Sequence, residues 1–198
     1  MNTDRMTELL DKISFPLCHS RTNVTTEANQ SFVLGDVNYR GQASVGYRTR
    51  GPSKYNKKYP ELFKAIKTFC KEYLPNDFSF TTIQVNKNVQ CKPHFDKNNV
   101  GSSCIIGLGD YTGGELVIEG KDYDIQNKIL QFDGKKGHWV KPFRGTRYSI
   151  ILFTHSFMPP NASTRNYEVT RYGMYNNGVR IVKYTKNGGV EVQSVRGS

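Results

Sequence analysis

Cysteine is scarce in this chain, and its few cysteines lie far apart. The 198 residues include 4 cysteines, at Cys18, Cys70, Cys91 and Cys104. No two of them form a Cys-x-x-Cys pair, so the sequence predicts neither a zinc knuckle nor the disulfide framework of a small secreted domain. We therefore expect reduced thiols in an intracellular protein, and we interpret Cys70 as part of a hydrophobic core.

Long apolar runs are missing as well. No stretch approaches the roughly 20 apolar residues that a membrane-spanning helix needs, and the N-terminus lacks the apolar centre of a signal peptide. We expect a soluble protein without a membrane partner, in either nucleus or cytoplasm. A hydrophobic content of 36% with 11 phenylalanines suits one well-buried core. The sequence thus predicts a single domain over residues 1–198, and we expect a monomer.

Acidic residues are the third shortage, with 17 Asp and Glu against 28 Lys and Arg and a net charge of +11. This balance favours a polyanionic partner, because lysines and arginines that neutralise phosphates release counterions. A merely soluble basic surface is the alternative. Basic and aromatic residues interleave in residues 47–59, which we interpret as a loop that contacts nucleic acid, or else as a solvated linker. The cations of this expected loop are Arg48, Arg50, Lys54, Lys57 and Lys58.

The apolar pattern predicts few helices and many short strands. Helical spacing covers residues 4–13 and 60–74, each followed by a proline. Strand-like segments, separated by turns, lie around Phe32 and Leu34 and at 78–86, 103–108, 115–118, 123–126, 129–132, 138–140, 147–155, 179–184 and 190–195. We expect residues 110–114, 127–128 and 187–189 to turn successive strands into hairpins. The predicted fold is α+β and mainly β: a jelly-roll with helices on one sheet, its core at about 78–157 and a basic extension at 158–198.

The segment from Cys91 to His155 carries the chemistry that stands out. In an extended strand, His94 and Asp96 point to the same side, so both can ligate one ion. His138 completes two histidines and one carboxylate, a set that suits a non-haem Fe(II) site with open coordination positions. A lone His-x-Asp often arises by chance, and His138 beside Trp139 is also consistent with ordinary packing.

Arg147 follows His138 by nine positions and begins an apolar, strand-like run. A planar guanidinium pairs with a carboxylate through two hydrogen bonds. Arg147 is therefore suited to hold the far carboxylate of a dicarboxylic cosubstrate while its other end chelates the iron. This order of groups indicates an oxygenase that uses 2-oxoglutarate and O2.

Residues 78–157 resemble the TET/J-binding-protein branch of the 2-oxoglutarate and Fe(II) oxygenases, which oxidise the methyl group of 5-methylcytosine or thymine in DNA. The likeness rests on Arg147-x-Ser149, on His155 eight positions after the arginine, and on Asn99 five positions after His94. It implies that Arg147 and Ser149 bind 2-oxoglutarate, and that His155 and Asn99 contact a base flipped out of double-stranded DNA.

The resemblance has further implications and two departures. Gln84 and Asn86 become candidates for polar contacts to 2-oxoglutarate, although sheet-edge hydrogen bonding explains them equally well. The family also has an upstream arginine that contacts the cosubstrate, which would here be one of the arginines in residues 47–59, and the sequence does not say which one. Phe153 stands where the family often has a tyrosine that touches the base, and the cysteine-rich zinc region of animal members is absent.

Two other functions fit part of this pattern. A prolyl or other protein hydroxylase shares the order His-x-Asp, His and Arg or Lys. A catalytically inactive jelly-roll that serves binding or structure is the second alternative. The basic charge and the Arg-x-Ser-then-His spacing favour the nucleic-acid enzyme, and the complete set of ligands speaks against an inactive one.

Overall fold

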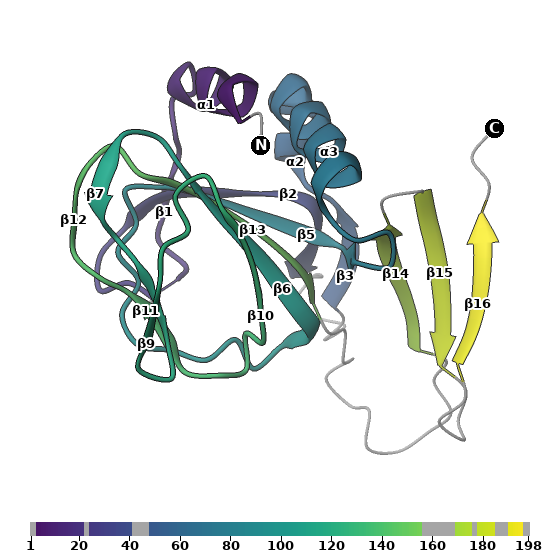
Figure 1. Ribbon diagram of the computed structural model, residues 1–198. Helices are drawn as coiled ribbons and strands as arrows, with labels where there is room; N and C mark the ends of the chain where they lie inside the picture. The colour runs from purple at the N-terminus through teal and green to yellow at the C-terminus, as the bar shows by residue number, and fades with distance from the viewer. Residues whose placement is uncertain are drawn as a thin grey trace.

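The computed structural model describes residues 3–21, 24–40, 48–155, 169–175, 178–184 and 190–195. Within them the chain is mainly antiparallel β-sheet with a few helices (Figure 1). No helix in these ranges is long and apolar enough to cross a membrane. The helices are α1 (Asp4–Asp11), α2 (Lys54–Lys58) and α3 (Pro60–Tyr73). The strands are β1 (Leu17–Cys18), β2 (Asn29–Arg40), β3 (Arg48–Pro52), β4 (Ser79–Phe80), β5 (Thr82–Lys87), β6 (Asn99–Leu108), β7 (Tyr111–Gly113), β8 (Leu116–Ile118), β9 (Lys121–Tyr123), β10 (Ile129–Phe132), β11 (His138–Val140), β12 (Phe143–Gly145), β13 (Tyr148–His155), β14 (Val169–Tyr175), β15 (Gly178–Tyr184) and β16 (Val190–Val195).

The largest sheet has the strand order β1-β2-β5-β13-β6-β10, and β3 pairs with β2 beside it. All of these pairings are antiparallel. Strand β13 lies between β5 and β6, so Ser149 is opposite Asn86 on one side and Gly107 on the other. The last strand of the predicted core thus lies in the interior of the sheet.

Helices cover one face of this sheet, and small strands lie over the other (Figure 1). The predicted helices at 4–13 and 60–74 are confirmed as α1 and α3, with α3 beginning at Pro60 and ending before Pro75. Their apolar stripes pack on residues such as Phe32, Leu34 and Ile83 in the main core. Cys70 belongs to this core, as predicted.

A second, smaller core lies on the opposite face of the sheet. It joins Ile105 and Ile151 of the large sheet to Leu116 and Val140 of the sheet β11-β8-β9. Because neighbouring strand residues point to opposite faces, Ile106 and Ile150 belong to the helix-side core instead. The layer between the two sheets is therefore built from alternate residues of β6 and β13.

The structure corrects several local expectations. Residues 47–59 were expected to form a loop, yet residues 48–52 form strand β3 and residues 54–58 form helix α2. Ser53 separates them as the helix cap: its Oγ accepts a hydrogen bond from the Tyr55 N–H and donates one to the Val33 carbonyl. A serine cap ahead of the basic run was the available signal for this helix.

Two expected hairpins were also wrong. Strands β6 and β8, which flank residues 110–114, do not pair with each other: β6 joins the large sheet, β8 joins the small one, and β7 between them pairs with β12. Likewise β9 pairs with β8 and β10 pairs with β6. The segment 78–86 is divided as well, because Thr81 separates β4 from β5. The turn residues thus predicted where the chain reverses, but they did not predict which strands pair.

The C-terminal segment forms its own antiparallel sheet, of order β16-β15-β14-β4. The predicted pairing of 179–184 with 190–195 is confirmed by β15 and β16, while the turn at 187–189 lies outside the described residues. Strand β14 pairs with β4 through Met174 with Phe80 and Tyr175 with Ser79. This sheet is therefore joined to the main body directly before β5.

Candidate metal and cosubstrate site

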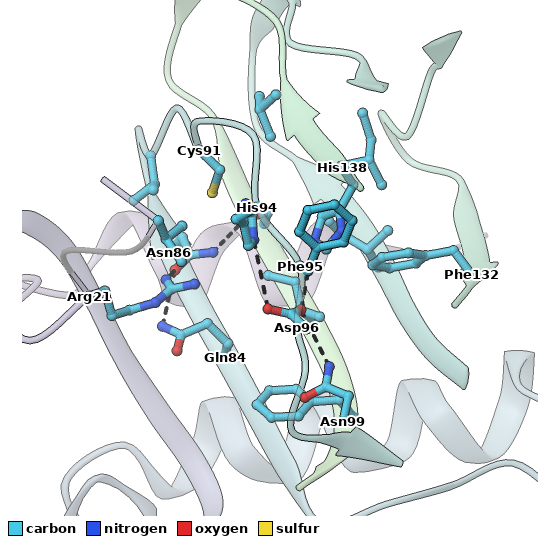
Figure 2. Close-up of a pocket in the computed structure, with 18 of the residues that line it drawn as sticks. Arg21, Gln84, Asn86, Cys91, His94, Phe95, Asp96, Asn99, Phe132 and His138 are labelled. Atoms are coloured by element: carbon cyan, nitrogen blue, oxygen red, sulfur yellow. Dashed lines mark hydrogen bonds and ion pairs between the residues drawn. The ribbon is translucent and has the colours of Figure 1, made fainter. Parts of the chain in front are cut away.

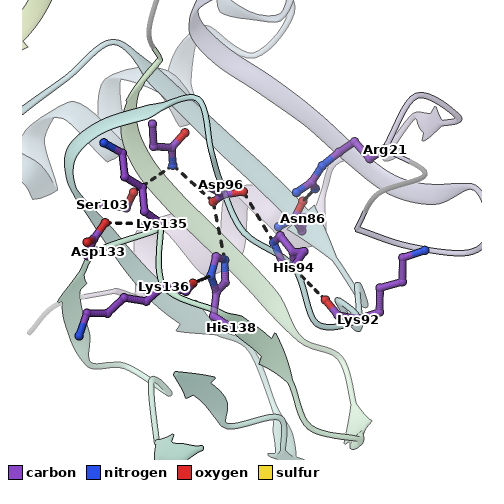
Figure 3. Close-up of polar contacts among 11 residues, drawn as sticks. Arg21, Asn86, Lys92, His94, Asp96, Ser103, Asp133, Lys135, Lys136 and His138 are labelled. Atoms are coloured by element: carbon purple, nitrogen blue, oxygen red, sulfur yellow. Dashed lines mark hydrogen bonds and ion pairs between the residues drawn. The ribbon is translucent and has the colours of Figure 1, made fainter. Parts of the chain in front are cut away.

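The structure brings the three predicted metal ligands together between the two sheets. One ligand atom each of His94, Asp96 and His138 lies within 4.8 Å of the other two. Nε2 of His94 is 3.7 Å from Oδ1 of Asp96, and Nε2 of His138 is 3.7 Å from Oδ2 (Figure 3). A single cation between these atoms would be bound by two neutral nitrogens and one carboxylate.

Backbone pairing places the two histidines. His94 and His138 exchange both backbone hydrogen bonds, each 3.0 Å long, across an isolated antiparallel bridge. Residues paired in this way project to the same side of the strands, and the two ring centroids are 4.3 Å apart. Asp96 is held next to them because its N–H donates to the Gly134 carbonyl at 2.8 Å.

Two further hydrogen bonds fix which ring nitrogen is free. Nδ1 of His94 lies 2.7 Å from the Lys92 carbonyl, and Nδ1 of His138 lies 2.8 Å from the Lys136 carbonyl. A carbonyl only accepts, so each Nδ1 carries the proton and each Nε2 presents its lone pair to the site. Burial lowers the pKa of His94, which favours the neutral form that binds metal; the hydrogen bond to Lys92 opposes this shift.

A cavity of about 580 Å³ opens beside these ligands (Figure 2). This size is within the range of small-molecule sites. One row of its wall consists of alternate residues of β13: Ser149, Ile151, Phe153 and His155. Asn99, Gln84 and Asn86 come from neighbouring strands. All three predicted metal ligands and six other predicted side chains thus line the same cavity.

Arg147 shares the face of Ser149 but does not line this cavity. Its side chain is only 1% exposed, with the guanidinium carbon 5.4 Å from the ring centroids of Tyr111 and Phe143. Among the described residues, neither Nε nor Nη2 has a hydrogen-bond partner. Burial lowers the pKa of this arginine, and buried N–H donors without acceptors are costly. These free donors are therefore suited to an anionic group that reaches them.

A chain of polar contacts crosses the cavity wall from Arg21 to Ser149 (Figure 2). The Arg21 Nη1 donates to Oδ1 of Asn86 at 2.9 Å, and the Gln84 amide donates to the same oxygen at 3.0 Å. Nδ2 of Asn86 donates to Ser149 Oγ at 3.0 Å. Gln84 and Asn86 thus line the cavity while they hydrogen-bond within the interior of the sheet, and their contact with 2-oxoglutarate stays a prediction.

Arg21 is the site residue that the sequence did not reveal. It lines the cavity, yet it lies in a stretch without periodic pattern or motif, some seventy residues before His94. Contact between residues 24 and 92 brings this stretch to the metal loop, through the Lys92 N–H and the Val24 carbonyl at 2.9 Å. Cys91 lies near both Arg21 and Arg147; burial raises the pKa of its thiol, and the two positive charges oppose that shift.

The residues expected to contact a substrate base form the other end of the cavity. Asn99 and His155 are opposite each other on β6 and β13, and the rings of Phe153 and His155 are 6.3 Å apart. Nδ2 of Asn99 donates to Oδ2 of Asp96 at 3.3 Å and to Oγ of Ser103 at 3.2 Å. Asn99 therefore also supports the metal-binding carboxylate, a contact that sequence spacing did not indicate.

Of the five cations proposed for nucleic-acid contact, the three with described side chains, Lys54, Lys57 and Lys58, do not line this cavity. Lys54, Lys57 and Lys58 lie on helix α2 rather than on a loop. The ammonium groups of Lys54 and Lys58 lie 5.2 Å and 5.9 Å from the Tyr55 ring centroid. The backbone of Arg48 and Arg50 belongs to β3, and their side chains are outside what the structure describes.

Fold and site together define a mainly antiparallel β protein with a cluster of two histidines and an aspartate in a cavity between sheets. A solved structure with a similar fold is an oxidoreductase of the 2OG-Fe(II) oxygenase family from Burkholderia pseudomallei, with a TM-score of 0.50, 16% sequence identity and 76% of each chain covered. No family model and no curated protein matches the sequence. The likeness establishes the fold that the two proteins share.

Proposed function

We propose that this protein is a dioxygenase that depends on Fe(II) and 2-oxoglutarate. The observation that carries the proposal is the cluster of His94, Asp96 and His138, with both Nε2 lone pairs turned inward and a cavity beside it. The shared fold with a 2OG-Fe(II) oxygenase family oxidoreductase supports it. We assign the two facing sheets to the double-stranded β-helix, or jelly-roll, of the cupin type.

The donor set fits the iron and the cosubstrate. Two imidazoles and one carboxylate would hold Fe(II) and leave coordination positions open. Bound iron would supply the activation of O2 for oxidation of a C–H bond, with 2-oxoglutarate as the second electron donor. Arg147 would bind the far carboxylate of 2-oxoglutarate, because its buried donors have no partner among the described residues. Ser149 and the Arg21–Asn86 pair would orient the same molecule.

We propose the methyl group of a pyrimidine base in DNA as the position that is oxidised. Asn99, Phe153 and His155 lie around the cavity near the metal cluster, where a flipped base would present its edge. The net charge of +11 suits a polyanionic substrate. A base within a duplex does not reach a recessed site, so double-stranded DNA would have to release it from the stack.

The orientation of Asn99 favours 5-methylcytosine over thymine. Its amide nitrogen donates to Asp96, whose carboxylate only accepts, so Oδ1 is the group turned away from Asp96 (Figure 2). An acceptor in this position complements the exocyclic amino group of cytosine, whereas thymine has a carbonyl there. We expect 5-methylcytosine to be converted to 5-hydroxymethylcytosine faster than thymine is converted to its hydroxymethyl product.

Succinate release tests this function. The purified protein with Fe(II) and 2-oxoglutarate should release succinate fastest with DNA that contains 5-methylcytosine, and mass spectrometry of nucleosides should find the hydroxymethyl product. Unmethylated DNA and proline-containing peptides serve as comparisons. Stimulation by peptides alone would identify a protein hydroxylase, and no succinate with any substrate would identify a protein without this activity.

A further inference from the structure

Phe95 lies between two metal ligands in the sequence, yet its side chain faces outward. It is 56% exposed, and only Leu17, at 63%, is another exposed large apolar side chain among the described residues. Phe95 also lines the mouth of the cavity. The ring is therefore accessible to solvent at the cavity that the metal ligands line, where a bound molecule can contact it.

The turn before β11 supports the ring from one side. A Cβ atom on Gly137 would lie 3.2 Å and 3.3 Å from two ring carbons of Phe95, so only glycine leaves the ring in this position without a shift. A Cβ atom on Gly134 would likewise lie 3.3 Å from Cβ of Asp96 and 3.1 Å from Nδ2 of Asn99. The backbone of residues 134–137 thus holds both the metal loop and Phe95.

Three exposed lysines lie on the two segments that carry Phe95 and Gly137. Lys97 lines the same cavity mouth, and Lys92 and Lys135 are exposed on the segments that carry the metal ligands. None of these three lysines forms an ion pair within the described ranges. A flat apolar face among free cations matches a nucleotide, whose base stacks while its phosphate pairs with an ammonium group.

We propose that Phe95 stacks on the nucleobase next to the one that is oxidised. The inference rests on the proposed function, since it assumes that one base enters the cavity. Because the Phe95 ring points outward at the cavity mouth, it would contact the nucleotide next to the flipped one, which stays outside the cavity. Phe95 is then a substrate-binding residue that selects unpaired or locally opened nucleic acid, because a neighbouring base stacks on protein only after it leaves its own stack.

The test compares wild type and Phe95 variants in binding a short single-stranded oligonucleotide that contains one 5-methylcytosine, with and without the neighbouring base. Binding is measured by fluorescence anisotropy without oxygen. Stacking on an aromatic side chain contributes about 1–3 kcal/mol per base, so Phe95→Ala should weaken binding by roughly 5- to 150-fold. An abasic site beside the 5-methylcytosine should weaken binding to the wild type similarly, with little further loss for Phe95→Ala. Phe95→Trp should retain the affinity, and Phe95→Leu should not.

Leu17→Ala is the matched control, because it removes another exposed apolar side chain away from the cavity and should leave binding unchanged. Equal affinity of Phe95→Ala and wild type, or equal sensitivity of both to the abasic site, overturns the stacking role and leaves the proposed dioxygenase intact. A wild type that binds no oligonucleotide but releases succinate with peptides overturns the nucleic-acid substrate and the stacking role together. No succinate from any substrate refutes the enzyme itself.

Discussion

At the scale of single residues, the metal ligands are the most direct test of the site. His94→Ala, Asp96→Ala and His138→Ala should each remove Fe(II)-dependent turnover, because each removes one of three ligand groups. Loss of a supporting contact alone typically costs about 10- to 100-fold in metal affinity, so loss of a ligand should exceed this. Calorimetric titration with Fe(II) measures the affinity, and circular dichroism checks that the fold persists. Full activity in one variant removes that residue from the set.

Replacing Arg147 should change activity and stability in opposite directions. In the unliganded protein its buried guanidinium has unpaired donors, and replacing a buried charge with an apolar side chain of similar length relieves that cost. We expect Arg147→Met to raise the free energy of unfolding without 2-oxoglutarate, by about 1–3 kcal/mol, while removing activity. Urea unfolding of wild type and variant measures this.

The conservative change at the same position addresses the bond geometry. Arg147→Lys keeps the charge but loses the planar pair of donors, so the KM for 2-oxoglutarate should rise about 10- to 100-fold, as expected for the loss of one charge-assisted hydrogen bond. Arg144→Lys is the control, because Arg144 is exposed on β12. If the KM stays the same in Arg147→Lys, another residue holds the far carboxylate.

His155 tests the substrate side of the cavity. If it contacts a flipped pyrimidine, His155→Ala should abolish oxidation of DNA but leave slow decarboxylation of 2-oxoglutarate without product, because the metal ligands and Arg147 remain. Succinate and modified nucleosides, measured in the same reaction, give the ratio of the two events. A parallel fall of both would instead assign His155 to support of the fold or of the cosubstrate.

At the scale of elements, the segment between β7 and β8 has a role beyond reversing the chain. A Cβ on Gly114 would lie 2.9 Å from Nε of Arg147, and the backbone there has φ +74. Gly114→Ala should therefore displace the guanidinium and raise the KM for 2-oxoglutarate. Gly120→Ala is a matched control, because Gly120 has φ +81 but nothing within 4 Å of its Cβ position. Equal kinetics in both variants would show that Arg147 tolerates the extra methyl group.

Strand β13 shows why the site was more predictable than the strand pairing. Its alternation puts Ser149, Phe153 and His155 on one face, and this follows from spacing alone. The pairing partners of β8, β9 and β10 do not follow from spacing, because neighbouring segments of similar composition can each pair with the same strand edge. The sequence showed that the chain reverses at residues 110–114, but not that it crosses there from one sheet to the other.

At the scale of the whole molecule, the reactivity of the cysteines reports on the packing of the main core, which contains Cys70 and Cys104. Burial raises the pKa of Cys70 and of Cys104 to about 12, so neither thiol ionises near neutral pH. For Cys18, burial is the largest influence and acts to raise the pKa, but hydrogen bonds with Ser20 and Ser31 and the charge of Arg21 together outweigh it, so the pKa is lowered. A thiolate-specific reagent at neutral pH should modify Cys18 first, and Cys70 and Cys104 only after unfolding. Mass spectrometry of the labelled protein reads the order, and early labelling of Cys70 would contradict the packing.

The overall layout was predictable from composition and pattern, whereas its long-range contacts were not. Apolar periodicity located α1 and α3, and residue order located the metal cluster. Arg21 escaped detection because its place in the cavity depends on a contact between segments about seventy residues apart, for which its own neighbours carry no pattern. The basic segment was misjudged because charge and aromatic content outweighed a single serine cap.

The bridge between His94 and His138 has a consequence for which metals the protein accepts. Backbone hydrogen bonds and the Lys92 and Lys136 carbonyls already orient both rings. Binding of an ion therefore costs little entropy for ordering its ligands, and it changes the fold little. Imidazole ligands bind zinc, copper and nickel as well as iron, so the ligand types do not select iron. Divalent metals should then follow their general order of affinity, in which zinc and copper exceed iron. Occupation by zinc would leave a folded, inert protein, and active enzyme would depend on which ion is available when the chain first folds.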